Sequence, residues 1–585
     1  MSEIFTSIYK CLNRGLKIRL FILIIFSLIT PLLEMIGIAA IIPIIQISLN
    51  NFDVSQYSKL SFLINLFAVE LDKSLVIYIL ILLIFLFFLF KVFFLIFCEN
   101  FKLKYIKSLQ DIFSLRLYSS YIFSNYEDFL NLKFSEKNRN IGIVGSLTGY
   151  LKICNQIFVE IFFFIFIFFF LLNYNLNITI ITFLIFLTVS IIIYFLFKNK
   201  ILNLALRRHN LSPKITQNLL DVFYSLKEVI ILKRRNLFKK QFEKNFSFVT
   251  DTVRKEGLIQ FIPRNILELT VVSAILIVIS YIFISNSSIN ENLELIGVFT
   301  FAMLKISLSA NKLLLGFQGL KSVKIPANEV SKELLLHSRM KNSIFDQNEN
   351  IDNKLNFNKS ISLKNINFTY SGTSKKILNN INIEIIKNKI IGISGESGSG
   401  KTTLINLILG FVKPTSGRVL LDNFDIHSDV KLWHNSLAYV PQDVFLFNDS
   451  IKNNILFGID QKEVKIEEIN RVLKIVNLDE FIAKLDDGVD TIVGEKATKL
   501  SGGQGQRVGI ARSLLKDKEI IFLDEATSKL DEVNEFQIIE KLINKLGGKK
   551  TIIIISHRDK TLDKFCDEIY ELSNSILYLK HKKIL

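Results

Sequence analysis

Long apolar runs fill most of the first 320 residues, whereas the remainder carries the mixed apolar and polar pattern of an ordinary α/β domain. A transmembrane helix needs about 20 apolar residues, and six runs are candidates for such helices. They cover residues 20–49, 75–98, 158–172, 178–197, 266–285 and 295–315. The first is longer than one span needs and is interrupted by Pro31, Glu34 and Pro43. The pattern predicts an α-helical polytopic membrane domain over residues 1–325, a linker over 326–354 and an α/β domain over 355–585.

Basic residues are distributed unevenly between these runs. The segments 101–150 and 198–260 are rich in Lys and Arg, whereas the connections 173–177 and 286–294 contain neither. Cytoplasmic loops of membrane proteins carry an excess of Lys and Arg. Both termini and the α/β domain are therefore expected in the cytoplasm, and the two connections outside. The first run is too long for the core of a signal peptide and lacks a cleavage site, so a multi-pass membrane protein is expected.

Several helices are expected to extend beyond the membrane. Residues 99–117 and 198–220 stay compatible with a helix, which suggests long stalks on the cytoplasmic side. Two segments at the turns, 126–130 and 226–232, would then touch the α/β domain. Ordinary amphipathic turns would have the same pattern, so both interpretations stay open.

The connection between the first two runs has a pattern of its own. Apolar residues recur there at helical spacing, at Tyr57, Leu60, Leu63, Ile64 and Phe67. They predict a short amphipathic helix on the outer face, which would either rest in the lipid interface or cap a loop.

The formal net charge of +17 raises the question of an acidic partner. A strongly basic chain can indicate nucleic-acid binding. Here much of the excess lies in loops beside the apolar runs, where anionic lipid accounts for it. No nucleic acid is therefore expected as a partner. The four Cys lack paired or metal-ligand spacing, so neither a disulfide framework nor a zinc site is predicted.

One segment of the α/β domain has the spacing of a phosphate-binding loop. Its residues are Gly395, Glu396, Ser397, Gly398, Ser399, Gly400, Lys401 and Thr402. Glycines let the backbone curl around phosphates with its N–H groups inward, and a following helix adds its positive end. Lys401 would reach the β- and γ-phosphates, and the Thr402 hydroxyl would hold Mg²⁺. The segment therefore predicts ATP and Mg²⁺ as cofactors.

Two further motifs follow in order, LSGGQ at residues 500–504 and IIFLDE at residues 520–525. With them, the α/β domain resembles the nucleotide-binding domain of ABC transporters. The whole chain resembles an ABC exporter half-transporter, with six spans followed by one ATPase. The resemblance implies an ATP hydrolase coupled to transport across a membrane. It also implies that Tyr370 stacks on adenine and that Thr403 joins the nucleotide site.

The resemblance assigns the chemistry to four more residues. Gln442 matches the Q-loop, which senses Mg²⁺ and contacts the membrane domain. Asp524 would hold Mg²⁺, and the adjacent Glu525 would orient and deprotonate the attacking water. His557 matches the switch histidine that contacts the γ-phosphate.

The LSGGQ motif resembles the family signature that closes on a nucleotide held by the opposite subunit. It contributes Ser501, Gly502, Gly503 and Gln504. Because one chain has one phosphate loop and one signature, a complete site implies two chains, most simply a homodimer that sandwiches two ATP. Gly505 stands where a charged residue is usual and Lys529 where Ala is usual. Neither departure removes a group that does chemistry.

Three segments bear on the substrate, EMIGIAAIIP at 34–43, PRNILE at 263–268 and FLFNDSI at 445–451. Together they resemble bacterial flippases, which turn polyprenyl-pyrophosphate-linked oligosaccharides across the inner membrane for protein glycosylation. The resemblance implies a lipid substrate of this kind and a location in the bacterial inner membrane. Two other functions stay open. One is export of a peptide, drug or simple lipid, and the other is a membrane-anchored ATPase with a regulatory role.

Three basic residues are candidates for substrate binding, namely Lys91, Lys305 and Arg264. Ionisable groups inside a bilayer are costly and usually face a cavity. A cavity lined by these cations would suit a pyrophosphate. The alternative is ion pairs that only hold the bundle together, between Lys91 and Glu34 or Glu160 and between Arg264 and Glu268.

Overall fold

The computed structural model describes residues 2–40, 73–131, 134–284, 289–338, 355–370, 373–494, 498–528 and 531–583. The chain forms two compact units. The first consists of Met1–Ser124 and Asp128–Phe345, and the second of Asn125–Glu127 and Asp346–Leu585. Three predicted features lie outside the described residues: the end of the first apolar run, the helix at 57–67, and Lys529.

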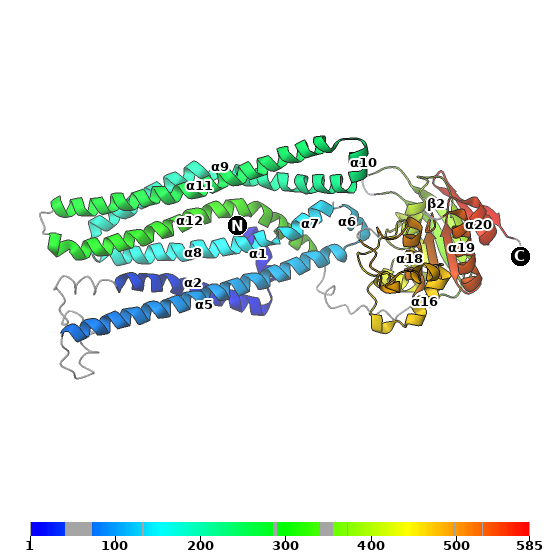
Figure 1. Ribbon diagram of the computed structural model, residues 1–585, viewed down its shortest axis with the longest axis horizontal. Coiled ribbons are helices and arrows are strands. Elements are labelled where there is room, and N and C mark those ends of the chain that lie inside the picture. The colour runs from blue at the N-terminus through cyan, green and yellow to red at the C-terminus, as the bar shows by residue number, and fades with distance from the viewer. Residues whose placement is uncertain are drawn as a thin grey trace. The chain divides into compact units, whose positions relative to one another are not determined.

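The described part of the first unit is helical (Figure 1). Its helices are α1 (Ser2–Cys11), α2 (Arg14–Ala39), α5 (Lys73–Ile122), α6 (Tyr126–Asn131), α7 (Phe134–Gly142), α8 (Val144–Leu172), α9 (Leu176–Tyr224), α10 (Leu226–Ile231), α11 (Arg235–Ile284) and α12 (Ile289–Ser338). Among the described residues, six segments are long and apolar enough to cross a membrane, within α2, α5, α8, α9, α11 and α12. The predicted polytopic membrane domain is therefore confirmed.

The helices are longer than the apolar runs that predicted them. Continuous helix covers residues 99–117 within α5 and 198–220 within α9, as the predicted extensions require. Pro31 does not interrupt the first run but lies inside α2. The connection after α8 is short, since α9 begins at Leu176 and the Asn175 side chain accepts a hydrogen bond from the Ile178 N–H. Helix α12 continues beyond residue 325 to Ser338.

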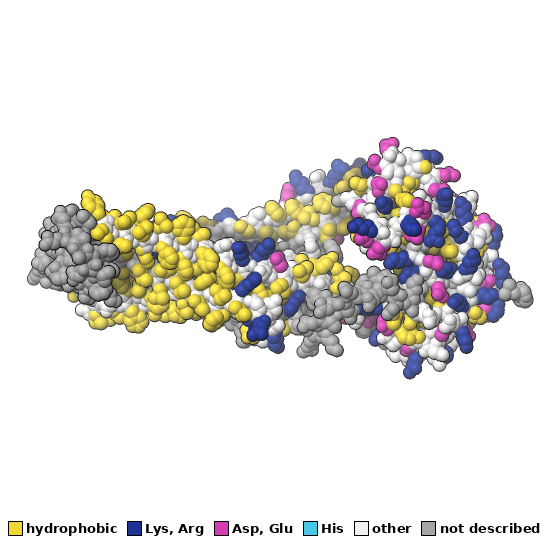
Figure 2. All heavy atoms as spheres, turned by 90° about the horizontal axis from the view of Figure 1, so that it is seen from below, with side chains coloured by type: hydrophobic (Ala, Val, Ile, Leu, Met, Phe, Trp, Pro, Cys, Tyr) yellow, Lys and Arg dark blue, Asp and Glu magenta, His cyan; other side chains and the backbone are white. Residues whose placement is uncertain are grey.

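The surface of the helical unit matches a lipid environment. Figure 2 shows a broad, nearly continuous cover of apolar side chains, bordered by Lys and Arg. Large apolar residues on α5 are strongly exposed, for example Phe85 at 61% and Phe93 at 65%. An apolar face of this extent is costly in water, and a bilayer removes that cost because its interior is equally apolar.

The second unit is an α/β domain built on two sheets. One has the order β2-β1-β4-β5 and the other β10-β9-β3-β8-β7-β6. The strands are β1 (Ser360–Phe368), β2 (Leu378–Ile386), β3 (Ile390–Ser394), β4 (Ser416–Leu421), β5 (Phe424–Asp425), β6 (Leu437–Val440), β7 (Ile520–Asp524), β8 (Thr551–Ile555), β9 (Glu568–Ser573) and β10 (Ile576–Lys582). The larger sheet carries the central parallel strands, in which β3, β7 and β8 are buried along their whole length.

Helices of this domain pack around the sheets and cover two hydrophobic cores. They are α13 (Lys401–Ile408), α14 (Val430–Ser436), α15 (Ile451–Leu456), α16 (Ile466–Ile475), α17 (Asp479–Ile482), α18 (Gly502–Leu514), α19 (Glu532–Leu546) and α20 (Asp559–Phe565), with 3₁₀ turns at Gln461–Glu463 and Gly488–Asp490. The parallel order β3-β8-β7-β6 brings the carboxyl ends of four strands to one edge. Ligands of open α/β sheets bind at such an edge.

Candidate active site

The phosphate-binding loop follows β3 and leads directly into α13, as the sequence predicts. Gly400 precedes the helix with φ +105°. Gly395 has φ +146°, and a Cβ there would meet the Leu572 carbonyl oxygen at 2.5 Å. Both positions therefore need glycine. The loop ends at a helix N-terminus, where free N–H groups and the helix dipole favour an anion.

The Lys401 side chain packs against the phosphate-binding loop. Its Nζ donates hydrogen bonds to the carbonyl oxygens of Gly395 and Glu396, both at 2.8 Å. The residue is only 7% exposed, and burial lowers the pKa of the Lys401 ammonium. The nearby carboxylates of Glu525 and Asp524 act in the opposite direction. The structure thus gathers the loop lysine and both predicted carboxylates in one site.

Glu525 lies at the centre of the predicted catalytic group. Gln442 donates from Nε2 to Glu525 Oε2 at 2.6 Å, and His557 Nε2 lies 2.7 Å from Glu525 Oε1. The strand register explains this meeting, because β7 and β8 pair in parallel and Asp524 stands opposite Ile555. Glu525 has φ +45°, an uncommon conformation for a residue with a side chain. The three residues proposed for catalysis therefore form one hydrogen-bonded cluster.

Asp524 is the buried carboxylate of the site, at 8% exposure. Burial raises the pKa of Asp524, and the Tyr439 hydroxyl donates to its Oδ2 at 3.2 Å. The described residues contain no group of three or more His, Cys, Asp or Glu side chains that could hold a metal. One carboxylate and the Thr402 hydroxyl fit Mg²⁺, which keeps several waters and shares substrate phosphates rather than needing an all-protein cage.

Tyr370 lies just beyond β1 and is 40% exposed. Its hydroxyl is 3.1 Å from Thr403 Oγ1, and its ring packs edge-on against Phe368 with 4.8 Å between centroids. Thr403 belongs to the first turn of α13, next to Lys401. These contacts hold an exposed aromatic ring beside the phosphate-binding loop, where stacking on a base is geometrically available.

The signature residues form the start of α18. Ser501 is its N-cap and forms a capping box with Gln504. The Ser501 hydroxyl accepts a hydrogen bond from the Gln504 N–H, and the Gln504 side-chain oxygen accepts one from the Ser501 N–H. Among the described residues, no hydrogen bond or ion pair joins this helix start to the phosphate-binding loop. The exposed, capped N-terminus leaves N–H groups that suit an anion. Gly505 follows inside the helix, where a Cβ would make ordinary contact with Leu446 at 3.6 Å.

Gln506 is a site residue that sequence reasoning missed. It is 1% exposed, and its Nε2 donates to Ser528 Oγ at 3.2 Å and to the Gln442 carbonyl at 3.4 Å. The side chain therefore joins the signature helix to the Q-loop and to the segment after Glu525. Its position two residues beyond LSGGQ is the only hint that the sequence provides.

Glu535 on α19 forms a second missed link. It is 2% exposed, accepts a hydrogen bond from Thr527 Oγ1 at 3.0 Å, and is paired with Arg558. Thr527 follows Glu525 by two residues, and Arg558 follows His557 directly. The buried carboxylate thus ties together the segments that carry Glu525 and His557, two of the side chains predicted for catalysis.

We expect Glu535→Gln to destabilise the domain and to lower ATP turnover. The amide keeps an acceptor for Thr527 but loses the charge that pairs with Arg558, a loss of about 1.5–3 kcal/mol for a hydrogen bond to a charged group. Thermal unfolding and steady-state ATPase assays of the full chain measure both effects. The exposed Glu532→Gln on the same helix is the matched control. Equal melting temperatures for the two variants would contradict the assignment.

The cations predicted for substrate binding are all paired with carboxylates. Lys91 and Lys305 share Glu34, with Nζ to Oε2 distances of 3.0 and 3.1 Å. Arg264 pairs with Glu268 at 3.1 Å, and both side chains are mostly exposed. Two lysines on one carboxylate leave one positive charge in excess. The Arg264 pair is neutral, and exposed pairs of this kind contribute little to stability.

A polar cavity of about 640 Å³ lies beside the shared Glu34. Its wall also contains Lys305 and, from α8 and α12, Glu160, Ser309 and Lys312. Glu160 accepts from Ser309 and pairs with Lys312 at 3.1 Å. Sequence reasoning missed Lys312 and Ser309, because their meeting with Glu160 depends on how two distant helices pack.

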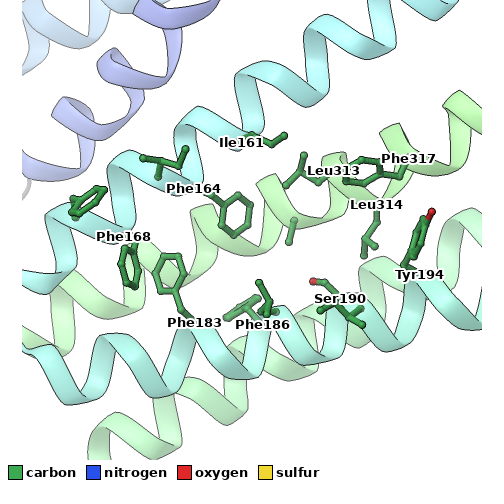
Figure 3. Close-up of a pocket in the computed structure, with 15 residues that line it drawn as sticks. Ile161, Phe164, Phe168, Phe183, Phe186, Ser190, Tyr194, Leu313, Leu314 and Phe317 are labelled. Carbon is green, nitrogen blue, oxygen red and sulfur yellow. The ribbon is translucent and has the colours of Figure 1, made fainter. Parts of the chain in front are cut away.

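A second cavity of about 650 Å³ lies between α8, α9 and α12 and is lined mainly by aromatic and aliphatic side chains. Figure 3 shows Phe164 and Phe168 of α8 facing Phe183 and Phe186 of α9, with Leu314 and Phe317 of α12 toward the end where Tyr194 lies. The size is within the usual range of ligand pockets. We call this cavity the phenylalanine groove.

Sequence comparison finds a family match within the second unit. The ABC transporter family matches residues 378–528. A putative export ATP-binding/permease protein of Rickettsia prowazekii is 43% identical over 209 residues, and an ATP-dependent lipid A-core flippase of Vibrio vulnificus is 41% identical over 205. Each match covers 35% of this chain and 35% of the relative. The chain therefore spans about a third of the length of these curated relatives.

Structural comparison covers nearly the whole chain. A bacterial Atm1-family ABC exporter with ATP bound matches with a TM-score of 0.72 over 96% of this chain and 95% of that chain, at 22% sequence identity. At this coverage the likeness includes the helical unit. Residues 378–528 therefore match the ABC transporter family, and the chain joins this domain to a helical unit with the fold of the solved exporter.

Proposed function

We propose that the protein is an ATP-driven exporter or flippase of the bacterial inner membrane. The observation that carries this function is the cluster of Gln442, Glu525 and His557 beside an intact phosphate-binding loop. A regulatory ATPase without transport does not need six apolar membrane helices with a polar cavity among them. The exporter fold and the relatives named for export support the same activity.

The chemistry follows from the contacts of Glu525. Its carboxylate would accept a proton from the attacking water as the water oxygen bonds to the γ-phosphorus and the bond to the bridging oxygen breaks. His557 and Gln442 hold the two carboxylate oxygens in place. Lys401 would stabilise the charge on the phosphates. Mg²⁺, held by Asp524, Thr402 and Gln442, would neutralise the phosphate oxygens when bound.

The working unit is proposed to be a homodimer. The N-terminus of α18 is exposed and has no hydrogen bond or ion pair with the phosphate-binding loop of its own chain, as far as the described residues go. A second copy would bring its Ser501 and Gln504 to a nucleotide held by Lys401 and Thr403. ATP binding would then close two sites together, and hydrolysis would open them again. Both termini would lie in the cytoplasm.

The cargo is proposed to be a polyprenyl-pyrophosphate-linked oligosaccharide used in protein glycosylation. Support comes from the charge at the wall of the polar cavity. Lys91 and Lys305 share the single carboxylate of Glu34, so one positive charge is not neutralised by this carboxylate. Arg264 would add a contact only after leaving Glu268. One relative is named an ATP-dependent lipid A-core flippase, and this name is consistent with a lipid cargo.

Cargo that binds the cavity is expected to raise ATP turnover of the reconstituted protein. Lys305→Gln should raise the concentration of a polyprenyl-pyrophosphate oligosaccharide that gives half-maximal stimulation of ATP turnover about tenfold. This change corresponds to a loss of about 1.4 kcal/mol in the free energy of lipid binding. Lys332→Gln on the same helix is the control. ATP turnover that ignores this lipid but responds to peptides or drugs would favour the alternative cargo, and turnover that responds to none of them would favour a regulatory ATPase.

A further inference from the structure

The phenylalanine groove ends near two lysines that no carboxylate neutralises within the part of the chain that the structure describes. Lys198 follows Tyr194 on α9 by one turn, and Lys321 follows Phe317 on α12 by one turn. Lys321 Nζ lies 4.9 Å from the Tyr194 ring centroid, and Lys198 Nζ lies 4.1 Å from that of Phe195. Neither lysine forms an ion pair with any residue that the structure describes.

This arrangement differs from that of the polar cavity. Lys91, Lys305 and Lys312 each lie within 3.1 Å of a carboxylate oxygen. At the end of the phenylalanine groove, Lys198 and Lys321 contact aromatic rings, and neither lies within ion-pair distance of a carboxylate that the structure describes. An anion that binds there gains the attraction of two lysines and does not have to displace an internal ion pair.

The groove also has the length and depth of one lipid leaflet. At a rise of about 1.5 Å per residue, Phe183 and Tyr194 are about 16 Å apart along α9, and Tyr194 is about 27 Å from Leu176. The hydrocarbon core of a bilayer is about 30 Å thick. If the turn before Leu176 lies at one surface, the apolar walls line the opposite leaflet, and Lys198 reaches its headgroup level.

The walls are exposed on the surface of the single chain. Phe169, Leu187 and Ile191 line the groove and are 62%, 58% and 46% exposed. In Figure 3 the aromatic side chains of α8 and α9 converge on the space between the helices, with Tyr194 and Phe317 at one end. An exposed apolar channel that ends at two cations is complementary to a hydrocarbon chain joined to a phosphate.

We propose that the phenylalanine groove binds one anionic phospholipid of the surrounding leaflet, with an acyl chain along Phe164, Phe183 and Phe317 and the phosphate at Lys198 and Lys321. The site is distinct from the polar cavity assigned to the cargo. Its occupant is independent of which cargo the protein moves.

Fluorescence quenching by brominated lipids tests the site in the full chain. A Leu187→Trp variant places an indole in the groove, while the native Trp433 is fully buried in the ATPase domain and gives a constant background. In phosphatidylcholine nanodiscs, brominated phosphatidylglycerol should reach half-maximal quenching at an about tenfold lower mole fraction than brominated phosphatidylcholine. Basal ATP turnover of the Leu187→Trp variant, measured beside the wild type, verifies that the reporter protein is intact.

The double substitution Lys198→Gln with Lys321→Gln should reduce this preference to less than about twofold. The control pair Lys214→Gln with Lys332→Gln lies on the same helices, removes the same charge and should keep the preference. Equal quenching by the two lipids, or an unchanged preference in the first pair, would overturn the proposal. So would an absence of quenching, which a second copy covering the groove would cause. Displacement by a polyprenyl phosphate that phosphatidylglycerol cannot reverse would assign the groove to cargo instead.

Discussion

Replacing Glu525 with Gln is expected to slow ATP turnover by about 10²–10⁴-fold, the range for loss of a general base. In the wild type, Gln442 and His557 contact the two carboxylate oxygens of Glu525 at 2.6 and 2.7 Å. The amide of the variant has the same shape and can still contact both residues. It cannot take a proton from water. ATP binding should persist because the phosphate-binding loop and Lys401 are unchanged. Phosphate release and equilibrium ATP binding, measured on the same preparation, separate the two effects.

The matched control for this variant is Glu519→Gln. Glu519 directly precedes β7, whose other end leads into Glu525, and it pairs with Lys387 at the surface. Loss of the Glu519 charge should leave ATP turnover close to that of the wild type. Turnover of Glu525→Gln within a few-fold of the control would show that another group acts as the base.

If each ATP site is shared between two chains, two different inactive variants should restore ATP turnover when they form a mixed dimer. Lys401→Ala removes the phosphate contact from one partner, and Ser501→Arg blocks the signature of the other. A mixed dimer then has one site with both defects and one intact site. If the chains pair at random, half of the dimers are mixed, and each mixed dimer has one intact site of two. ATP turnover should therefore recover to about a quarter of the wild-type value.

Each parent variant alone should be inactive, which the same ATPase assay measures. Ser501→Arg also removes the N-cap of α18 at a cost of about 0.5–2 kcal/mol, so thermal unfolding must verify that the chain folds. A co-expressed mixture no more active than its parents would mean that the phosphate-binding loop and the signature do not work in trans.

The sequence predicted the architecture because its signals are local. Apolar runs identified all six candidate membrane helices, and the glycine pattern located the phosphate-binding loop after β3. Helix ends were less accurate, since α12 continues to Ser338, into residues that were predicted to form a linker. Pro31 was wrongly treated as an interruption, because proline is tolerated within a membrane helix when its surroundings compensate the lost hydrogen bond.

Contacts between distant segments could not be predicted in the same way. Gln506 and Glu535 have ordinary polar side chains in the sequence, and only the packing of α18 and α19 beside β7 reveals their links to the catalytic segment. The same holds for Glu34, which meets Lys91 and Lys305 from two other helices. Sequence reasoning named Glu34 as a possible partner of Lys91, but the sharing of one carboxylate depends on three helices at once.

Translocation across a sealed vesicle tests the central claim most directly, that hydrolysis at Glu525 drives movement of an amphipathic lipid. The full chain is reconstituted with a labelled polyprenyl-pyrophosphate oligosaccharide, and a membrane-impermeant reagent reports which leaflet holds the label. The account predicts that ATP moves the label across the bilayer with the wild-type protein and not with Glu525→Gln. A label that stays in its leaflet despite active ATP turnover, or that moves equally in Glu525→Gln, would contradict it.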